Sequence, residues 1–467
     1  MAEPHGPCGS AGKTTVPMKI TALAICPPPA AGGNPSVTPE LLASSLARYS
    51  RSNKGIDTIL QSIDWNDPDR SVDAIFRFVD YGHASIAGMT GGIAMVIDGC
   101  SMYLAYKLFE IAQLCDGQES STRYIRLDAS DIPSATSLGI PDAHSGTWRE
   151  LMERSFTRYN SVYAELDDQA TADPSVVRVP DGANEKVRDR LRKNYALDRA
   201  RYFIPFATKT NAAYIMTARV WTETIKQLDS LPLPEAHTCA EGLRGELRKF
   251  TPRLMRHSYP DEASIAQALH SLQPAIEGLR RTGLPMRQCD DEVFVGLDRE
   301  IPRFFPAGIT TGTAFDGKVN RYSTVGTAIR RQFVRAAWSN MAIAELRDLN
   351  RHRSGYRFSP LNPVGFYLPV DIDRSKCGEL FEGAVKFCRD VVASDQAAAY
   401  IYGLHLGTQV YFEHSTHLDK FIYEIELRTG MGAHFRYAEH LAAAGHELRS
   451  LQPDLEPFIS IGTAEPE

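Results

Sequence analysis

The sequence predicts a helix-rich α+β protein made of two similar units in tandem. Helical periodicity dominates the 467-residue chain, and the extended apolar segments are short and few. The order of expected elements after about residue 310 resembles the order before about residue 260, which indicates an internal duplication. A chain of this length also exceeds a single typical core, since domains hold roughly 100–200 residues.

The first unit begins with a short strand and continues in helices. An apolar run over 19–27 ends at a stretch of three prolines, which favours a strand that stops there. A helix follows from Pro39, because Thr38 can cap it and proline is favoured in the first helical turn. Periodicity predicts further helices over 74–80, 101–114, 147–166, 209–228 and 240–257.

The second unit follows an irregular stretch over 302–318 that contains prolines and glycines. Its first long helix is predicted over 327–350, because apolar residues recur there at every fourth position: Ile329, Phe333, Ala337 and Met341. Two more helices are predicted over 377–402 and 417–428. We therefore expect three segments: a flexible N-terminal tail over 1–18, a first domain over 19–300 and a second domain over 301–460.

Composition excludes several classes of function. A net charge of −6 gives no basic field for nucleic acid. The apolar stretch 86–106 contains Asp98 and four glycines, so we expect a protein core element there and no membrane partner. The eight cysteines form no Cys-x-x-Cys pair, so we expect free thiols, no metal site and a cytoplasmic location.

Two clusters of residues suit a phosphate group. Arg351-His352-Arg353 places two guanidinium groups around an imidazole, which suits phosphate or an electron-rich ring. The alternative is that these cations only complement a helix dipole. The segment Glu119-Ser120-Ser121-Thr122-Arg123-Tyr124 offers hydroxyl groups and one arginine in a turn, which suits a single phosphate or forms an ordinary hydrophilic turn.

Two further clusters contribute one arginine each. Arg201 precedes the apolar run Tyr202-Phe203-Ile204-Pro205, and by itself it would be a surface charge. Arg428 ends the helix predicted over 417–428, where it points inward or pairs with Glu424 one turn earlier. Together Arg123, Arg201 and Arg428 would neutralise the charge of a nucleotide monophosphate, and without an anion they would repel one another.

Together these clusters resemble the flavin-dependent thymidylate synthase family. The similarity covers most of the chain as two copies, about 19–260 and about 310–455, and implies two tandem domains of that fold. The segments that carry it are Ala47-Arg48-Tyr49-Ser50, Gly82-His83-Ala84-Ser85, Ser101, Ser121-Thr122-Arg123-Tyr124, Ala200-Arg201-Tyr202-Phe203-Ile204-Pro205, Arg351-His352-Arg353 and Glu426-Leu427-Arg428-Thr429.

The resemblance implies a reaction and its partners. Enzymes of this family methylate C5 of deoxyuridine monophosphate with FAD, methylene-tetrahydrofolate and NADPH, at sites between the subunits of a homotetramer. For this chain it implies a pyrimidine nucleotide monophosphate as substrate and FAD as cofactor, with NADPH and methylene-tetrahydrofolate as further co-substrates. Because two domains share one chain, it also implies a homodimer that mimics the tetramer.

The resemblance assigns roles to residues of this chain as well. Substrate binding falls to Glu119, Ser120, Ser121, Arg123, Arg201 and Arg428. Flavin binding falls to Ser50, Arg351, His352 and Arg353. The catalytic residues are Arg351 and Arg428, since a guanidinium near the ring would stabilise charge that develops as C5 becomes nucleophilic.

The two copies have lost complementary parts of this site. The first copy has Ile111-Ala112-Gln113 at the place of the Arg-His-Arg triplet and Leu228 at the place of Arg428. The second copy has Ile401 at the place of Arg201 and Leu361-Asn362-Pro363 at the place of the phosphate turn. We therefore expect one composite nucleotide site per chain, formed between the two copies.

Two departures from the family leave the reaction open. Gly88-Met89 replaces the family's Glu-His pair, which bears on folate use, and Asp348 replaces the glutamine before the triplet, which alters contacts to the pyrimidine. Two alternatives to C5 methyl transfer therefore remain. One is a non-catalytic scaffold that binds a nucleotide or flavin, and the other is a flavoenzyme that modifies another nucleoside-like substrate.

Overall fold

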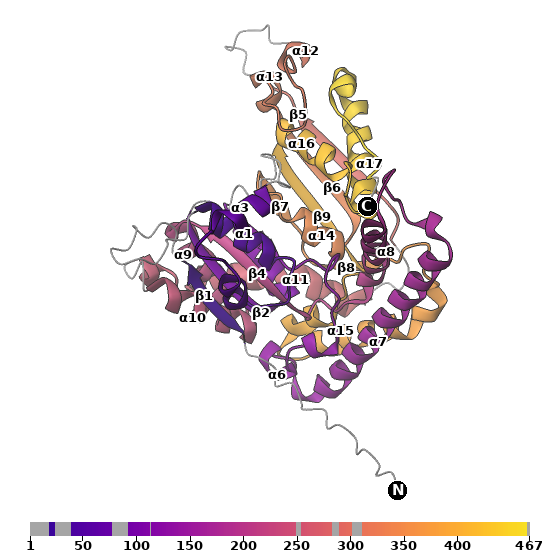
Figure 1. Ribbon diagram of the computed structural model, residues 1–467. Helices are drawn as coiled ribbons and strands as arrows, with labels where there is room; N and C mark the ends of the chain where they lie inside the picture. The colour runs from indigo at the N-terminus through magenta and orange to yellow at the C-terminus, as the bar shows by residue number, and fades with distance from the viewer. Residues whose placement is uncertain are drawn as a thin grey trace.

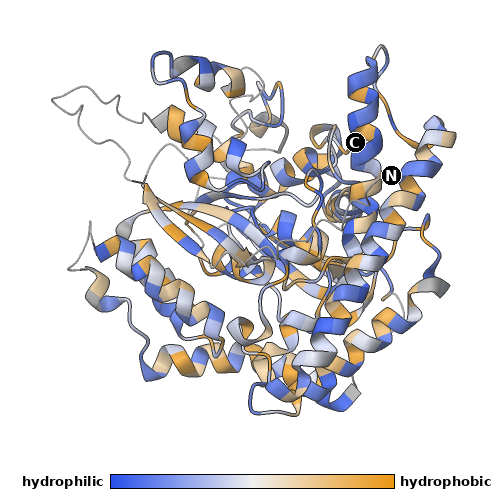
Figure 2. Cartoon of the chain, turned by 60° about the horizontal axis from the view of Figure 1, so that its bottom comes forward, coloured by the Kyte–Doolittle hydropathy of each residue, from blue (hydrophilic) through white to orange (hydrophobic). Residues whose placement is uncertain are grey.

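Two antiparallel sheets and the helices around them make up the protein (Figure 1). The computed structural model describes residues 18–23, 39–76, 92–112, 114–248, 254–282, 289–300 and 311–464. Helical segments dominate this part of the chain, so the predicted helix-rich α+β class with small sheets is confirmed. In Figure 2, hydrophilic residues gather along the peripheral helices, whereas the central strands are mostly hydrophobic or neutral.

The first sheet is built from the N-terminal half of the chain. Its strands are β1 (Lys19–Leu23), β2 (Ile93–Ser101), β3 (Asp116–Glu119) and β4 (Lys209–Met216), in the order β1-β2-β4-β3. One face is covered by α1 (Pro39–Tyr49) and α2 (Ile56–Gln61), with α3 (Asp69–Phe76) packed against α1. The other face packs on α5 (Met102–Ile111), α9 (Ala218–Asp229) and α10 (Pro234–Arg248).

The second sheet repeats this arrangement. Its strands are β5 (Val293–Asp298), β6 (Phe333–Ala342), β7 (Tyr356–Phe358) and β9 (Thr408–His417), in the order β5-β6-β9-β7, and β8 (Pro363–Phe366) pairs with β9. The helices α14 (Ile343–Leu349), α16 (Leu418–Arg428) and α17 (Phe435–Leu451) occupy the positions of α5, α9 and α10. Equivalent strands therefore follow the same order in both sheets, as the expected internal duplication requires.

Longer helices join the two units. The helix α7 (Asp142–Ala172) packs on both α8 (Glu185–Ala200) and α15 (Gly378–Val392). The helix α11 (Glu262–Thr282) lies between the units in sequence and contacts α9 and α15. The remaining described helices are short: η2 (Ala129–Asp131), α6 (Ala135–Leu138), η3 (Pro174–Val176), η4 (Arg201–Phe203), η5 (Leu254–His257), α12 (Thr311–Ala314), α13 (Thr327–Arg330), η6 (Arg374–Cys377), η7 (Ala397–Gly403) and η8 (Pro453–Phe458).

A short antiparallel contact connects equivalent segments of the two units. The backbone N–H of Phe206 donates to the carbonyl of Leu404 at 2.8 Å, and the N–H of Leu406 donates to the carbonyl of Ile204 at 2.9 Å. The two bonds are reciprocal, and Pro205 faces His405 between them. This pairing gives the units an approximate two-fold relation, and it fixes how their surfaces meet.

Three of the helices predicted from periodicity are wrong in part. The helix expected over 377–402 ends at Val392, and residues 397–403 form the separate 3-10 helix η7. Residues 209–216 form β4 and residues 333–342 form β6, and helix begins again only at Ala218 and Ile343. In β6 the side chains of Val334, Ala336 and Trp338 are buried while their neighbours face outward, which is the period of a strand. Apolar residues four apart satisfy both periods, so the pattern over 327–350 could not separate helix from strand.

The domain boundary expected between residues 300 and 301 stays a prediction, but the pairing of one strand favours an earlier boundary. Strand β5 precedes residue 300 in sequence but pairs along its whole length with β6, from Val293 opposite Trp338 to Asp298 opposite Phe333. We infer that the second unit begins before Val293. The tail expected over 1–18 lies outside the described residues except for Met18, as do Gly82-His83-Ala84-Ser85 and Gly88-Met89.

Two general findings concern membrane-spanning helices and metal sites among the described residues. No helix among them is long and apolar enough to cross a membrane. The same residues contain no group of three or more His, Cys, Asp and Glu side chains that could hold a metal ion.

The junction between the units makes stability depend on pH. His405 is fully buried, with its Nε2 2.8 Å from Ser155 Oγ, and burial lowers its pKa from 6.5 to about 4. The unfolded chain therefore binds one more proton than the folded chain between these values. Stability should be complete above pH 6.5 and should fall as the pH drops toward 4, by about 1.4 kcal/mol per pH unit for this one group.

Denaturant unfolding across this pH range measures the effect. His405→Gln should remove that part of the slope, whereas His446→Gln, at an exposed position, should leave the slope unchanged. An unaltered slope in His405→Gln would show that this imidazole does not titrate on unfolding.

Candidate functional site

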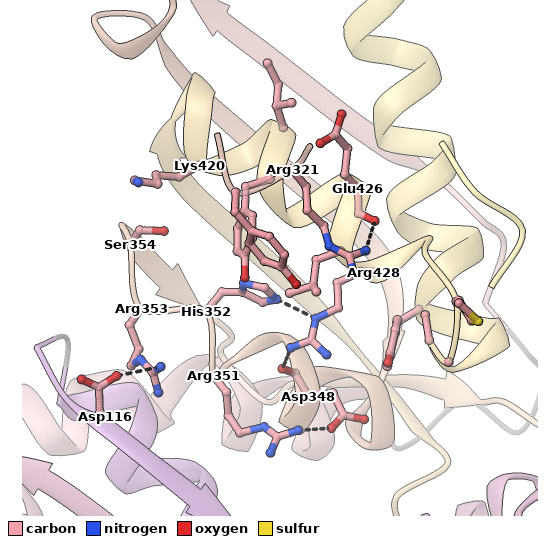
Figure 3. Close-up of a pocket in the computed structure, with 18 of the residues that line it drawn as sticks. Asp116, Arg321, Asp348, Arg351, His352, Arg353, Ser354, Lys420, Glu426 and Arg428 are labelled. Carbon is pink, nitrogen blue, oxygen red and sulfur yellow. Dashed lines mark hydrogen bonds and ion pairs between the residues drawn. The ribbon is translucent and has the colours of Figure 1, made fainter. Parts of the chain in front are cut away.

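A cavity of about 910 Å³ lies between the two units. The first unit contributes the end of α1 and the turn that follows β3. The second unit contributes the end of α14 with the residues after it, the segment 318–325, and the inner side of α16 (Figure 3). Described residues of both units therefore line one cavity, and a composite nucleotide site there stays a prediction.

The cavity is electropositive. Among the described residues that line it, nine are Lys or Arg and five are Asp or Glu, an excess of four positive charges with His neutral. The cations are Arg51, Arg123, Lys318, Arg321, Arg330, Arg351, Arg353, Lys420 and Arg428. The acids are Asp116, Glu119, Asp348, Asp419 and Glu426. A cavity with this balance favours an anionic ligand.

Eight of the ten predicted site residues line this cavity. They are Ser50, Glu119, Ser121, Arg123, Arg351, His352, Arg353 and Arg428. Ser120 lines a second cavity of about 710 Å³ on the other side of the turn. Arg201 lines neither cavity, because its side chain is only 2% exposed and lies behind Asp348.

The turn after β3 is held in place by α1 and α8. The N–H of Ser121 donates to the carbonyl of Ser50 at 3.1 Å, which ties the turn to the end of α1. Arg123 Nε and Nη2 donate to the two oxygens of Asp198 on α8 at 2.9 and 3.0 Å. Burial opposes the charge on Arg123, but Asp198 outweighs it and holds the guanidinium pKa well above its usual value. Arg123 is thus a fixed cation in the cavity wall.

The Arg-His-Arg triplet follows α14 directly. Arg351 Nη2 lies 2.6 Å from Asp348 Oδ1, and Arg353 Nη2 lies 2.7 Å from Asp116 Oδ1 of the first unit. Burial lowers the pKa of His352 well below its usual value, so its ring is neutral near pH 7. The triplet therefore presents two charged groups and one neutral ring to the cavity (Figure 3).

Arg428 reaches back from α16 to the triplet. Its Nε–H donates to His352 Nε2 at 2.6 Å, and its Nη2–H donates to the carbonyl of Asp348 at 3.0 Å. The predicted alternative, an ion pair with Glu424 one turn earlier, is wrong, because Glu424 faces His414 at 2.8 Å instead. No carboxylate in the described chain lies within ion-pair distance of Arg428, so its charge faces the cavity without a counter-ion.

Asp348 is the shared counter-ion of the site. Its carboxylate contacts Arg351 at 2.6 Å and Arg201 at 3.4 Å, as Figure 3 shows for the first of these. Burial disfavours the charged form, but Arg351, Arg201 and Arg428 outweigh it and hold the Asp348 pKa below its usual range. The argument that inward arginines need a bound anion is therefore wrong for Arg123 and Arg201, because the protein supplies carboxylates to both.

The carboxylate of Glu119 is engaged in an ion pair between the two units. It is 5% exposed and forms an ion pair with Arg347 of the second unit. Burial raises the pKa of the Glu119 carboxyl above its usual value even beside Arg347. This pair therefore binds the two units together at the rim of the cavity.

The reciprocal half-sites, formed by the other ends of the two units, carry different residues at the equivalent described positions. The hydrogen bond from Tyr103 N–H to the Phe206 carbonyl is equivalent to the one from Ala344 N–H to the Leu406 carbonyl. Tyr103 and Ala344 are therefore equivalent, and the residues seven positions after them are Glu110 and Arg351. The triplet's counterpart is thus Glu110-Ile111-Ala112, one residue earlier than expected. Asp116 pairs with Ile215 in the first sheet as Tyr356 pairs with Ser415 in the second, so Asp116 and Tyr356 are equivalent. The residues seven positions after them are Arg123 and Pro363. The helix α11 packs between α9 and the segment around Asn362, so it fills the place that the cavity occupies on the other side.

Several cavity residues escaped the sequence analysis. Lys318 and Arg321 belong to the irregular segment before α13, where no periodicity marks them, and Arg330 is the last residue of α13. Lys420 lies two turns before Arg428 on α16, which places both side chains on the same face of the helix. This spacing is the sequence signal that could have identified Lys420 as a cavity residue. The carboxylates Asp198 and Glu345 were missed because nothing in sequence links them to Arg123 and Arg201, which they contact.

Fold and cavity together define a duplicated α+β protein with an electropositive cavity between its two units. Residues 36–253 match the family described as thymidylate synthase complementing protein. The resemblance expected from the motifs is thereby confirmed. The whole chain is also similar to the UPF0159 protein Ta1429 of Thermoplasma acidophilum, with 24% identity over 471 residues that cover 89% of this chain and 93% of the relative.

Neutralising Asp348 should strengthen anion binding in the cavity. Asp348→Asn removes a negative charge that lies 2.6 Å from Arg351, so both Arg351 and Arg201 lose their shared counter-ion. We expect roughly tenfold tighter binding of inorganic phosphate by calorimetry, and lower thermal stability, since Arg201 stays buried.

The matched control is Asp395→Asn, an exposed carboxylate outside the cavity, which should change neither quantity. Weaker or unchanged phosphate binding in folded Asp348→Asn would mean that phosphate does not bind beside these arginines.

Proposed function

We propose that this protein is a flavin-dependent enzyme that transfers a one-carbon group to C5 of a pyrimidine nucleotide monophosphate such as dUMP. The similarity to thymidylate synthase complementing protein supports a thymidylate synthase-like activity. The observation that carries the finer proposal is the electropositive cavity between the units, into which Arg428 brings a charge with no carboxylate partner among the described residues.

The nucleotide's phosphate fits between the turn after β3 and the end of α16. Arg123 is fixed there by Asp198, and the hydroxyl of Ser121 and the guanidinium of Arg428 face the same space. Each carboxylate engages only some of the five N–H donors of an arginine, so donors remain for a phosphate. Arg201 would act through Asp348 and Glu345 rather than by contact, since it lines no part of the cavity.

The residues near the triplet suit a flavin. A flavin ring gains negative charge on reduction, and Arg351 and Arg353 supply fixed positive charge beside the neutral ring of His352. These residues and Ser50 would hold FAD, which supplies the electrons for reducing the transferred carbon. Methylene-tetrahydrofolate and NADPH remain proposed co-substrates, because the segment with Gly88-Met89 lies outside the described residues.

The protein's own contribution would be positioning and electrostatic stabilisation. Arg428 is held by His352 and by the carbonyl of Asp348, so its guanidinium keeps one orientation. A guanidinium fixed next to the pyrimidine would stabilise the charge that develops on the ring as C5 attacks the one-carbon group. Fixed charges of this kind need no reorganisation during the reaction.

One observation favours the scaffold alternative. Arg123, Arg351 and Arg353 each have a carboxylate partner within 3 Å, so these three of the nine cations are neutralised without a ligand. A protein that only binds a nucleotide would keep such a site intact as well. Turnover and binding must therefore be measured separately.

The visible absorbance spectrum of the purified protein tests the proposal directly. With FAD bound, addition of dUMP should shift the flavin spectrum, because both ligands occupy one cavity. Nucleotide binding without any flavin, even after FAD is added, would favour the scaffold. If neither ligand binds, the proposed function fails.

Arg428 should discriminate nucleotides from nucleosides. Arg428→Gln should weaken dUMP binding by about 1.5–3 kcal/mol, roughly 10- to 100-fold, because it removes a charged hydrogen bond to phosphate. Deoxyuridine, which lacks the phosphate, should bind both proteins equally in the same calorimetric assay.

Arg149→Gln provides the control, since Arg149 is exposed on α7 and lies away from the cavity. Equal loss of affinity for deoxyuridine and dUMP would place Arg428 at the ring instead of the phosphate.

A further inference from the structure

A buried carboxyl group lies one turn before Asp348 on α14. This group belongs to Glu345, which is fully buried and does not line the cavity. Its Oε1 accepts a hydrogen bond from the hydroxyl of Tyr202 at 2.6 Å and lies 3.5 Å from Arg201 Nη2. Its Oε2 has no hydrogen-bond partner in the described chain. Glu345 is therefore a titratable group behind the cavity wall, and it can affect the cavity only through its neighbours.

Arg201 connects Glu345 to the cavity wall. Its Nη1 lies 3.4 Å from Asp348 Oδ2, and the other oxygen of Asp348 lies 2.6 Å from Nη2 of Arg351, which lines the cavity. When Glu345 is charged, these two carboxylates balance the two guanidinium groups. When Glu345 is neutral, one carboxylate faces two guanidinium groups, and the net charge of the four residues rises from zero to +1. A proton on Glu345 therefore changes the charge directly behind the wall that a ligand meets.

The equivalent pair of residues on the other side of the junction is apolar. The equivalent hydrogen bonds to the Phe206 and Leu406 carbonyls make Leu104 the counterpart of Glu345, and Ile401 the counterpart of Arg201. Both counterparts are fully buried. Apolar residues therefore fill this place in the fold without an ion pair, as they often can at no loss of stability. The charged pair lies on the side of the junction that carries the cavity, which indicates that its role concerns the cavity and not the packing of the units.

Glu345 changes its charge near neutral pH. Burial raises the pKa of its carboxyl group to about 7, although Arg201 and the hydroxyl of Tyr202 both favour the charged form. The strands β6 and β9 and the helix α17 also pack on α14, and none of them forms an ion pair with Glu345 in the described chain. The titratable and charged groups that face Glu345 are Arg201 and Tyr202 of η4, Asp348 of α14, Arg436 of α17, and Tyr367 after β8.

We propose that Glu345 is a positioning residue for anion binding: its charge sets how much of the Arg201 charge rests on Asp348, and thereby how much of the Arg351 charge a bound anion meets. A protonated Glu345 strengthens anion binding, because Arg201 then relies on Asp348 alone. A bound anion in turn favours the protonated form, so binding takes up a proton near pH 7. The inference rests on the anion binding of the proposed function, but not on flavin or on the reaction.

Calorimetric titration of the full chain with inorganic sulfate between pH 6 and pH 9 tests the proposal. Sulfate keeps its charge over this range, and burial holds the pKa values of His352 and His434 well below the usual value, so neither ring titrates. The wild type should bind sulfate roughly fivefold more tightly at pH 6 than at pH 8, with a midpoint near pH 7. Glu345→Gln, which resembles the neutral form, should keep the tighter affinity at every pH.

Glu235→Gln is the matched control. Glu235 is also buried and accepts a hydrogen bond from a tyrosine of the other unit, Tyr402, at 2.9 Å, but it does not line the cavity. This variant should keep the pH profile of the wild type. Tyr202→Phe removes a hydrogen bond that favours the charged form of Glu345, so it should move the midpoint upward by about one pH unit. Tyr402→Phe should leave the midpoint where it is.

Three outcomes would overturn the proposal. The first is a wild-type affinity for sulfate that is the same at pH 6 and pH 8; if dUMP still shifts the flavin spectrum, the proposed function stands and this inference alone fails. The second is a pH dependence that Glu345→Gln retains, or that Glu119→Gln abolishes instead, since burial raises the pKa of Glu119 as well. The third is the absence of any sulfate binding, which would contradict the anion site itself.

Loss of folding in Glu345→Gln, which far-UV circular dichroism detects, leaves two deciding measurements. One is the midpoint of Tyr202→Phe. The other is the proton uptake of the wild type on binding sulfate at pH 7, measured by calorimetry in buffers of different ionisation enthalpy. No proton uptake, or an unchanged midpoint, would overturn the proposal.

Discussion

The antiparallel contact between Ile204 and Leu406 governs the rest of the structure. Its two reciprocal backbone bonds, 2.8 and 2.9 Å long, set the two units in one relative orientation. That orientation brings the turn after β3 near the ends of α14 and α16, so residues of both units line one cavity. Side chains reinforce the junction, since Glu119 pairs with Arg347 and Arg353 with Asp116 across it. The cavity therefore depends on the relative orientation of the two duplicated units.

Duplication followed by divergence explains why the two sides of this junction differ. On one side the walls carry arginines around a cavity, and on the other the equivalent positions are Glu110, Leu228 and Pro363 beside the packed helix α11. A buried cluster of like charges is costly without partners, so a side that binds no anion gains stability by packing apolar residues. The same divergence acts on the sheets, where α1 and α2 cover one outer face and aromatic residues mark the other.

The site also shows how a protein keeps several arginines together before a ligand arrives. Asp348 holds Arg201 and Arg351, and Asp198 holds Arg123, so each of these three arginines has a carboxylate partner within the protein. Arg428 differs because its partners are a neutral ring and a carbonyl. No carboxylate of the described chain forms an ion pair with Arg428, so the binding of an anionic ligand should depend most strongly on this residue.

The sequence by itself determined the α+β class, the duplication and most of the cavity wall, because short motifs such as Arg351-His352-Arg353 keep their chemistry wherever the chain places them. Tertiary structure alone decided which arginines face the cavity: Arg201 is buried behind Asp348, a contact across 147 positions that no local pattern records. It also decided that residues 209–216 and 333–342 are strands, because their partners lie far along the chain. The spacing of apolar residues indicates which side chains are buried, whereas pairing with distant segments determines whether the backbone that carries them is a helix or a strand.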